Sequence, residues 1–319
     1  MNELQVLTPG KSFQEQAAPG RCSPVDRGVK KVLVTGASGM LGRTVLKRFA
    51  SEKDLEVIPA YRSDVDVTSP EAVEALIVRH KPDVFLHLAA MTQVDRCETE
   101  KDLAFSVNAL GTRNVAAACR RHKVRLIAIS TDYVFDGQSE RPYTEFDHAG
   151  GAINVYGISK YAGEVAVHEE CPAHVIARVS WLYGSGGPSF VHAIRKLSDG
   201  TRPELKVVND QIGNPTSTDA VAEALLGVIR RPLITGTIHL TCEGEATWYE
   251  FAKKIVELSG INQRIVPCTS DEFPRPAARP RNSRLDKQML RLLGLPPMPH
   301  WEEALASFLR TEWHNNPAS

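Results

Sequence analysis

A glycine-rich turn near residue 36 constrains the fold of this protein more than any other segment. The apolar, β-branched run 31–35 predicts a buried parallel strand, and apolar residues at helical spacing follow over 40–50. Between them lies a G-x-x-G-x-x-G pattern made by Gly36, Gly39 and Gly42. In such a turn the first glycine permits the tight bend, the second lets the backbone approach a pyrophosphate, and the third lets the helix pack closely on the sheet. At this junction the pattern predicts a dinucleotide site at the helix N-terminus, rather than a turn that binds nothing.

Strands and helices alternate over the first half of the chain. After the first strand and helix, further strands are expected at 55–60, 83–88, 125–130 and 173–179. Helices are expected between and around them at 69–80, 103–121 and 156–170. Alternation of this kind is typical of a parallel sheet that is covered by helices on both faces. The sequence therefore predicts an α/β protein with a Rossmann-type, doubly wound parallel sheet.

The length of 319 residues fits about two domains. We predict an NAD(P)-binding Rossmann domain over 29–179, to which 217–240 return as one helix and one strand. After residue 179 the alternation becomes irregular, so 180–216 and 241–319 are expected to form a smaller C-terminal α/β domain that binds the substrate. Residues 1–28 mix Pro, Gly, polar and charged residues without periodicity, which predicts a disordered tail.

Charge and composition exclude several classes of protein. Lys and Arg number 38 and so do Asp and Glu, so the sequence has no basic field for general nucleic-acid binding or for an anionic membrane surface. No apolar run approaches the ~20 residues that span a bilayer, and the first 28 residues lack the apolar stretch of a secretory signal. Six scattered cysteines without a C-x-x-C pair fit a reducing compartment. We therefore expect a soluble cytoplasmic protein that binds neither nucleic acid nor membrane.

The end of the second expected strand indicates which dinucleotide binds. An acidic residue there would hold the ribose 2′-hydroxyl of NAD, but the segment 61–64 reads YRSD and has no carboxylate before its last position. The guanidinium of Arg62 can instead pair with a 2′-phosphate, which favours NADPH, with NADH as the alternative. The competing interpretation of Arg62 is a solvated loop residue. Asp66 and Val67, slightly later, are expected to contact the adenine.

Tyr156 and Lys160 form a Y-x-x-x-K pair that places the lysine one helical turn after the tyrosine. A phenol with a pKa near 10 is a poor acid–base group at neutral pH, and a nearby ammonium is expected to lower that pKa toward the working range. Tyr156 can then give a proton to a carbonyl oxygen while a hydride reaches the carbon. Lys160 can also hydrogen-bond the nicotinamide ribose. The pair alone is common by chance, but about 120 residues after the glycine turn it predicts a reductase.

Two further polar positions accompany this pair. Thr131 follows the fourth expected strand, at the sheet edge where ligands bind in open parallel sheets, and can hydrogen-bond the same carbonyl oxygen as Tyr156. The alternative is a Ser/Thr/Asp cluster that caps a turn. Asn108 lies in the expected helix over 103–121, where a buried amide either kinks the helix or orients Lys160 and a water molecule.

Together these motifs resemble the extended short-chain dehydrogenases/reductases and, within them, the dTDP-4-dehydrorhamnose reductase family. The resemblance covers residues 30 to about 310. The segments that carry it are 33–42 (LVTGASGMLG), 89–95 (AAMTQVD), 130–135 (STDYVF), 154–160 (NVYGISK), 180–184 (SWLYG), 209–216 (NDQIGNPT) and 278–280 (ARP). The segments STDYVF and DQIGNPT are much more specific than the glycine pattern.

The resemblance implies reduction of the C4 keto group of dTDP-4-dehydro-L-rhamnose to dTDP-L-rhamnose by NAD(P)H, the last step of dTDP-rhamnose synthesis. It implies a catalytic set of Thr131, Tyr156 and Lys160, with Tyr156 as proton donor. The implied cofactor contacts are Gly36, Ser38, Gly39, Met40, Leu41, Arg62, Asp66, Val67, Ala89, Ala90, Asn108, Tyr156 and Lys160. The implied substrate contacts are Thr92, Val94, Asp132, Tyr133, Trp181, Asp210, Gln211, Pro215 and Arg279.

Several points separate this sequence from its family or leave alternatives open. Trp181 taken alone is typical of a core aromatic, and Arg279 of a solvated loop residue. Some family members hold a metal ion with carboxylates at a subunit interface, and no residues here match them, so we expect no metal; a homodimer stays open. One alternative is a reductase or epimerase of another nucleotide sugar. Another is a dinucleotide-binding regulatory subunit like the beta subunit of methionine adenosyltransferase, although Thr131, Tyr156 and Lys160 favour an enzyme.

Overall fold

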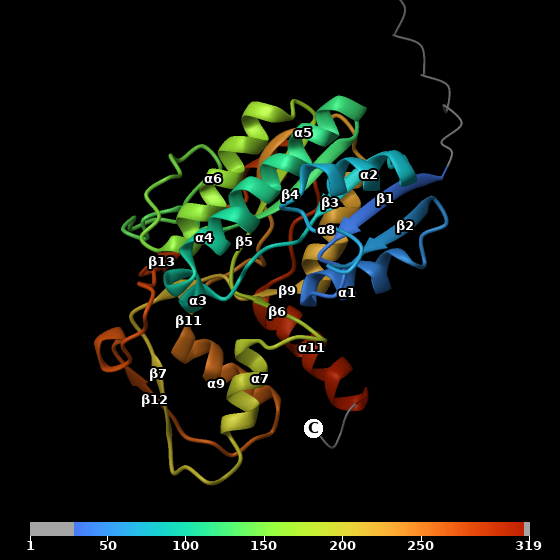
Figure 1. The fold of residues 1–319 in the computed structure, drawn as a ribbon. Helices are drawn as coiled ribbons and strands as arrows, with labels where there is room; N and C mark the ends of the chain where they lie inside the picture. Colours follow the sequence, from blue (N-terminus) through green and yellow to red (C-terminus); the bar gives the residue numbers. More distant parts are fainter. Residues whose placement is uncertain (1–28, 316–319) are drawn as a thin grey trace, which may run out of the picture.

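A six-stranded parallel sheet forms the centre of the computed structural model, which describes residues 29–315 (Figure 1). Its order is β10-β5-β4-β3-β1-β2, and every neighbouring pair runs parallel. The strands are β1 (Lys30–Thr35), β2 (Leu55–Ala60), β3 (Val84–His87), β4 (Arg125–Thr131), β5 (His174–Val179) and β10 (Gly236–His239). The predicted parallel α/β architecture is confirmed, and so is the return of a late strand to this sheet beside β5.

Helices cover both faces of the sheet, because side chains alternate along each buried strand. One face carries α1 (Met40–Phe49) and α8 (Thr218–Ile229), and the other carries α2 (Pro70–His80), α5 (Thr112–His122) and α6 (Val155–Glu170). Within β1, Val32 and Val34 belong to the α1–α8 side, whereas Leu33 belongs to the α2–α5 side. The strand order reverses between β1 and β3, and the glycine turn follows β1 at that position. Open α/β sheets bind ligands at this reversal, outside the carboxyl ends of the strands.

The predicted helix over 103–121 is confirmed, but a π-helical turn interrupts its α-helical hydrogen bonding. The chain forms α3 (Val94–Thr99), α4 (Lys101–Phe105), a π-helical segment (Ser106–Gly111) and then α5. The buried amide of Asn108 explains the interruption, because it bonds to both backbone groups of Met91 and to the Ser159 hydroxyl. Single π-helical turns inside helices commonly accommodate such insertions. Asn108 thus widens the helix and ties α6 to the loop after β3.

The C-terminal part packs beneath the sheet in the view of Figure 1. Its helices are α7 (Phe190–Leu197), α9 (Trp248–Leu258), α10 (Gln288–Leu292) and α11 (Trp301–Asn315). Its short strands pair as β6 (Leu182–Tyr183) with β9 (Thr216–Ser217), and β7 (Leu205–Val208) with β12 (Ile265–Cys268). In a third small sheet, β8 (Ile212–Gly213) lies between β11 (Ala246–Thr247) and β13 (Asn282–Ser283). The hydrophobic cluster under α1 and α8 continues into α7, α9 and α11. The two parts therefore share one core, in which Tyr183 packs on Phe251 and Phe308.

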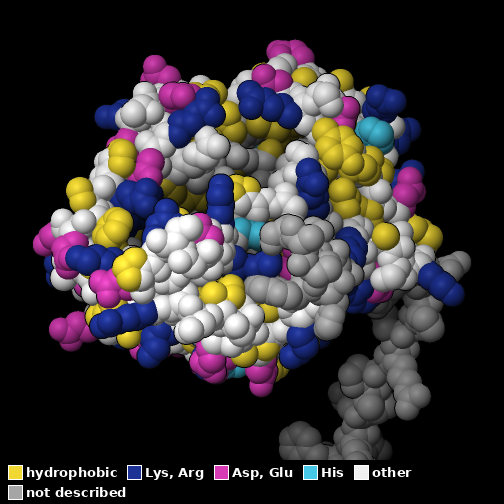
Figure 2. All heavy atoms as spheres, turned by 90° about the horizontal axis from the view of Figure 1, so that it is seen from below, with side chains coloured by type: hydrophobic (Ala, Val, Ile, Leu, Met, Phe, Trp, Pro, Cys, Tyr) yellow, Lys and Arg dark blue, Asp and Glu magenta, His cyan; other side chains and the backbone are white. Residues whose placement is uncertain are grey.

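The surface agrees with the balanced charge of the sequence. Figure 2 shows basic and acidic side chains interspersed over the face seen from below. Among residues 29–315, no helix combines the length and apolar character needed to cross a membrane. The predicted disordered tail, residues 1–28, lies outside the described residues.

A buried ion pair fastens α6 to the sheet. The guanidinium of Arg178, in β5, donates two hydrogen bonds to the Glu164 carboxylate, at 2.9 and 2.7 Å. Their side chains are 6% and 3% exposed, so neither charge has water as an alternative partner. Glu164 lies on α6 four residues after Lys160, and the pair therefore sets the position of the helix that carries Tyr156 and Lys160.

We expect Glu164→Gln to lower the free energy of unfolding by about 3 kcal/mol, because it leaves the buried Arg178 charge uncompensated. Glu223→Gln is the control, since Glu223 pairs with Arg48 while 63% exposed and should change stability little. Chemical denaturation of both variants measures the difference. Equal stability of the two variants would contradict this role of the buried pair.

Candidate active site

A cavity of about 570 Å³ lies at the carboxyl ends of the central strands. Its walls come from the glycine turn, the ends of β2, β3 and β4, the first turns of α6 and the segment that follows β5. Pro188 and Trp248 close it from the C-terminal part. This volume lies within the range of small-molecule and cofactor sites. The cavity thus occupies the position that the strand order predicts.

The glycine turn is shaped by its lack of side chains. Gly36 has a φ of +68°, and a Cβ there would lie 2.7 Å from the backbone of Leu88 and Ala89. A Cβ on Gly42 would collide with the Gly36 carbonyl oxygen. At Gly39 the nearest such atom is 3.2 Å away, so the fold tolerates a side chain better at this position. The fold requires glycine at 36 and 42, because a side chain there would collide with the backbone. Gly39 leaves the surface of the turn open to a ligand.

The N-terminus of α1 faces this turn and is suited to an anion. Gly39 is the N-cap residue and offers no side chain to the first backbone N–H groups, and the first turn of α1 contains no acidic residue. Unpaired N–H groups and the positive end of the helix dipole attract phosphate. Ser38, Met40 and Leu41 line the cavity beside them. These residues fit the pyrophosphate of a dinucleotide.

Tyr156 and Lys160 both line the cavity from α6. The side chain of Asn154 caps this helix by accepting a hydrogen bond from the Gly157 N–H, at 2.8 Å. The Lys160 ammonium donates to the carbonyl oxygen of Ile129 in β4, at 2.7 Å. Burial lowers the pKa of Lys160 to about 8, against an opposing attraction from Glu164. Lys160 is therefore a cation at neutral pH and is held against the sheet.

The expectation that Lys160 lowers the pKa of Tyr156 is wrong for this structure. Burial raises the pKa of the Tyr156 phenol well above its ordinary value, and a hydrogen bond with Thr131 only partly opposes this. The physical reason is that removal of the phenol from water disfavours the phenolate more than its neighbours stabilise it. Tyr156 consequently keeps its proton at neutral pH, which suits a proton donor.

Thr131 ends β4, and Asp132 begins the 3-10 turn that follows it. The Thr131 hydroxyl donates to Asp132 Oδ1 at 3.0 Å and accepts from the Tyr133 N–H at 3.2 Å. Burial raises the pKa of Asp132 to about 7, against hydrogen bonds from Ser283, Thr131 and Ser180. Asp132 also lines the cavity.

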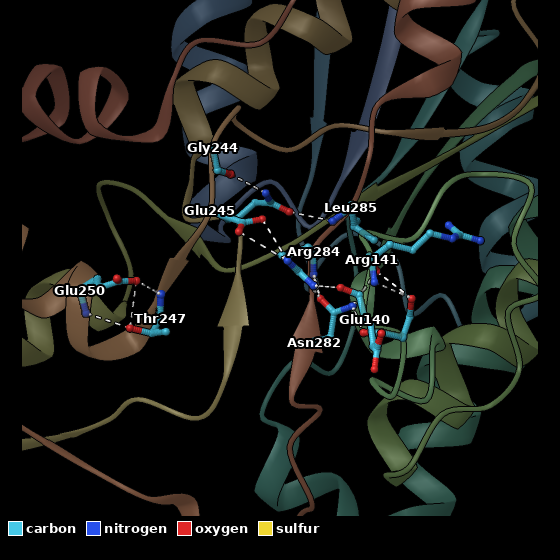
Figure 3. A network of polar contacts seen from close by, with 11 residues as sticks. Glu140, Arg141, Gly244, Glu245, Thr247, Glu250, Asn282, Arg284 and Leu285 are labelled. Carbon is cyan, nitrogen blue, oxygen red and sulfur yellow. Dashed lines mark hydrogen bonds and ion pairs between the residues drawn. The ribbon is translucent and has the colours of Figure 1, made fainter.

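A polar network joins this region to the C-terminal part (Figure 3). Arg284 bonds to Glu245 at 3.3 Å and to the Glu140 carbonyl oxygen at 2.6 Å. Asn282 donates to the carbonyl oxygen of Arg141 at 2.8 Å. The network fixes β13, and with it Ser283, against the loop that follows β4.

Most of the predicted site residues meet at this cavity. Those that line it are Gly36, Ser38, Gly39, Met40, Leu41, Arg62, Asp66, Val67, Ala89, Ala90, Thr92, Val94, Thr131, Asp132, Tyr133, Tyr156, Lys160 and Trp181. Five lie elsewhere: Asn108, Asp210, Gln211, Pro215 and Arg279. Arg279 instead pairs with Asp95 at 2.9 Å, and Asp210 accepts hydrogen bonds from Ser270. The polar side chains of Arg279 and Asp210, which were predicted to bind the substrate, are thus hydrogen-bonded to other protein groups.

Sequence reasoning missed other lining residues: Thr35, Ala60, Tyr61, Val65, Leu88, Val107, Ile129, Ser130, Val179, Leu182, Pro188 and Trp248. Several are strand ends, which the expected strand boundaries could have identified. Trp248 has no such signal, because it reaches the cavity only through the packing of α9.

Comparison with known proteins identifies the family. The family model described as the RmlD substrate binding domain matches residues 30–313. The chain belongs to this family. Among its relatives, a dTDP-4-dehydrorhamnose reductase of Streptomyces griseus is 42% identical over 279 residues, covering 86% of this chain and 91% of the relative. One from Mycobacterium tuberculosis is 38% identical, covering 88% and 92%.

Solved structures agree with this assignment to the RmlD family. A dTDP-4-dehydrorhamnose reductase of Clostridium acetobutylicum is 43% identical with a TM-score of 0.85, covering 88% of this chain and 99% of that one. The enzyme of Bacillus anthracis, solved in complex with NADP, is 39% identical with a TM-score of 0.85 and the same coverage. A UDP-glucose 4-epimerase of Thermus thermophilus, at 21% identity and a TM-score of 0.74, shares the fold.

We expect Gly39→Ala to weaken NADPH binding by about tenfold or more at a modest cost in stability, because its Cβ lies 3.2 Å from the Gly36 carbonyl oxygen and stands where a pyrophosphate must approach. Gly227→Ala in α8 is the control, since a Cβ there meets its nearest neighbour at 3.5 Å. Calorimetric titration with NADPH and thermal unfolding separate the two effects. Unchanged NADPH affinity in Gly39→Ala would contradict the assignment of this turn.

Proposed function

We propose that this protein reduces the C4 keto group of dTDP-4-dehydro-L-rhamnose to dTDP-L-rhamnose, with NADPH as the reductant. The observation that carries the proposal is the meeting of the glycine turn, Thr131, Tyr156 and Lys160 at one cavity. Membership of the RmlD family and the names of its relatives support this substrate class. The last step of dTDP-rhamnose synthesis is the reaction that fits both.

The glycine turn and the cavity residues that follow β2 and β3 suit NADP(H). The glycine turn and the start of α1 would hold the pyrophosphate, Arg62 the 2′-phosphate, and Asp66 with Val67 the adenine. Ala89 and Ala90 follow β3 and would lie along the nicotinamide half. When bound, the cofactor supplies the hydride. The NADP complex of the Bacillus anthracis relative supports this choice, with NADH as the alternative.

The cavity residues from β4 and α6 would hold and transfer the proton. Tyr156 holds a phenolic proton at neutral pH, because burial raises its pKa, and would give it to the substrate oxygen as negative charge develops there. Thr131 would hydrogen-bond the same oxygen. Lys160, with a pKa of about 8, is charged at neutral pH and would stabilise the resulting phenolate and orient the ribose.

We further propose a division of labour along the chain. Residues 29–179 with 217–240 would bind the cofactor, and 180–216 with 241–319 would complete the sugar-nucleotide site. Thr92, Val94, Asp132, Tyr133 and Trp181 line the cavity and would contact the sugar. The described cysteines are buried free thiols, which supports a reducing, cytoplasmic location. A homodimer stays a prediction.

We expect Tyr156→Phe to lower turnover of dTDP-4-dehydro-L-rhamnose by at least ~10²-fold, the lower end for a lost general acid, while NADPH still binds. NADPH oxidation measured by absorbance, with a panel of 4-keto sugar nucleotides, also tests the substrate. Tyr161→Phe is the control, because Tyr161 lies on the same helix and outside the residues that line the cavity.

Near-normal turnover in Tyr156→Phe would contradict the assignment of Tyr156 as the proton donor. A panel in which UDP-linked or other sugars react far better than dTDP-4-dehydro-L-rhamnose would overturn the proposed substrate.

We expect Arg62→Ala to weaken NADPH selectively, by roughly 1.5–3 kcal/mol for a lost charge-assisted hydrogen bond, and to leave NADH affinity nearly unchanged. Arg79→Ala is the matched control, because Arg79 is exposed in the last turn of α2. Fluorescence titration with both cofactors measures the effect. Equal weakening of NADPH and NADH would show that Arg62 does not read the 2′-phosphate.

A further inference from the structure

Two tryptophans, the indole pair Trp181 and Trp248, form one wall of the cavity. Their rings stack with centroids 3.5 Å apart and planes 8° apart. Trp181 follows β5, whereas Trp248 is the first residue of α9, so the pair joins the sheet to the C-terminal part. A stack of this kind holds two large side chains in one rigid arrangement.

Trp181 requires this support, because its backbone is strained. Its φ is +47°, in the left-handed region that bulky residues rarely adopt. Strain of this kind persists only where the surroundings enforce it, and it gathers at functional sites. Gly213 leaves room for the ring, since a Cβ there would lie 2.5 Å from Trp181 Cε2. The structure thus holds Trp181 in a conformation that its own backbone disfavours.

The position of Trp248 is set by contacts at the start of α9. The preceding residue, Thr247, forms a capping box with Glu250 at the start of α9 (Figure 3). The Thr247 hydroxyl also lies 2.7 Å from Asn209 Oδ1. Trp248 therefore begins a helix whose first turn is anchored to the NDQ segment, 209–211.

A hydrogen-bond series runs from the indole pair to Asp210. Trp248 Nε1 donates to Gln211 Oε1 at 3.2 Å, and Gln211 Nε2 donates to Ser270 Oγ at 2.8 Å. The Ser270 hydroxyl in turn donates to Asp210 Oδ1 at 2.7 Å, and its N–H donates to Asp210 Oδ2 at 3.0 Å. None of Asp210, Gln211 and Ser270 lines the cavity, whereas both indoles do.

We propose that Trp248 is a positioning residue for the sugar nucleotide and that Gln211 and Asp210 act on the substrate only through it. The series fixes the Trp248 ring, and the ring fixes Trp181, whose indole then offers a preorganised apolar surface to the sugar. The roles of Gln211 and Asp210 thus lie in orienting an aromatic wall, not in contacting the nucleotide. This inference rests on the proposed function for its substrate.

A double-mutant cycle with Gln211→Met and Trp248→Phe tests the series. Both variants break the hydrogen bond between Trp248 and Gln211. Gln211→Met keeps a side chain of similar length, and Trp248→Phe keeps an aromatic ring. Each should raise the KM for dTDP-4-dehydro-L-rhamnose by about three- to tenfold, with kcat and the NADPH dissociation constant within about twofold. Because both act at one contact, the double variant should be no worse than the more affected single variant. Gln263→Met is the matched control, since both glutamines are 9% exposed.

Circular dichroism gives a second readout that needs no substrate. Two stacked indoles couple their electronic transitions, and the exciton couplet that results depends on how one ring is rotated relative to the other; Trp248→Phe should abolish this couplet and Gln211→Met should alter it. Gly213→Ala, which crowds Trp181 without touching the series, should alter the couplet and raise KM in the same way.

Additive KM effects in the double variant, or an unchanged couplet in Gln211→Met, would overturn the proposal and place Gln211 on the ligand itself. If no sugar nucleotide is reduced by the unmodified protein, the proposed function fails. The couplet in Gln211→Met and Gly213→Ala still decides whether the series holds the indole pair.

Discussion

One face of α6 is held against the sheet by two charged side chains, and the candidate site depends on it. Lys160 donates to the carbonyl oxygen of Ile129 in β4, and Glu164 pairs with Arg178 in β5. Tyr156, Lys160 and Glu164 follow each other at intervals of four residues, so the anchored face is also the face that carries the phenol. The ion pair lies too deep to serve solubility. Its effect is to fix the positions of Tyr156 and Lys160 relative to the carboxyl ends of the strands.

Burial governs the chemistry of this site more than the charge of individual neighbours. The same desolvation raises the pKa of Tyr156, raises that of Asp132 to about 7 and lowers that of Lys160 to about 8. Each group is thereby moved toward its neutral form. A buried donor with an intact proton beside a cation suits reduction of a carbonyl, in which negative charge develops on oxygen. The phenol of Tyr156 is desolvated by its own surroundings, since Tyr156 packs against the cluster of Met91, Cys97, Ala104 and Val155.

Local sequence signals predicted the sheet, the glycine turn and the Tyr156–Lys160 pair, because strand alternation and helical spacing depend on neighbours in the chain. The helix over 103–121 was predicted, but its π-helical turn was not, because Asn108 bonds to Met91 and Ser159, contacts that only the folded chain brings together. Gln211 was assigned to a ligand from its motif, yet its amide is taken by Trp248 and Ser270. Trp248 itself was missed, since nothing local indicates that α9 starts at the cavity.

The central claim is that this cavity delivers a hydride to sugar C4 while the protein supplies the proton to its oxygen. The most direct test uses NADPH that carries deuterium at the transferable nicotinamide C4 position, with dTDP-4-dehydro-L-rhamnose as substrate and ordinary water as solvent. Mass spectrometry and NMR of the product locate the label. The account predicts one deuterium at C4 of dTDP-L-rhamnose and none elsewhere. Deuterium at another carbon, or product formed without deuterium while NADPH is unconsumed, would contradict it.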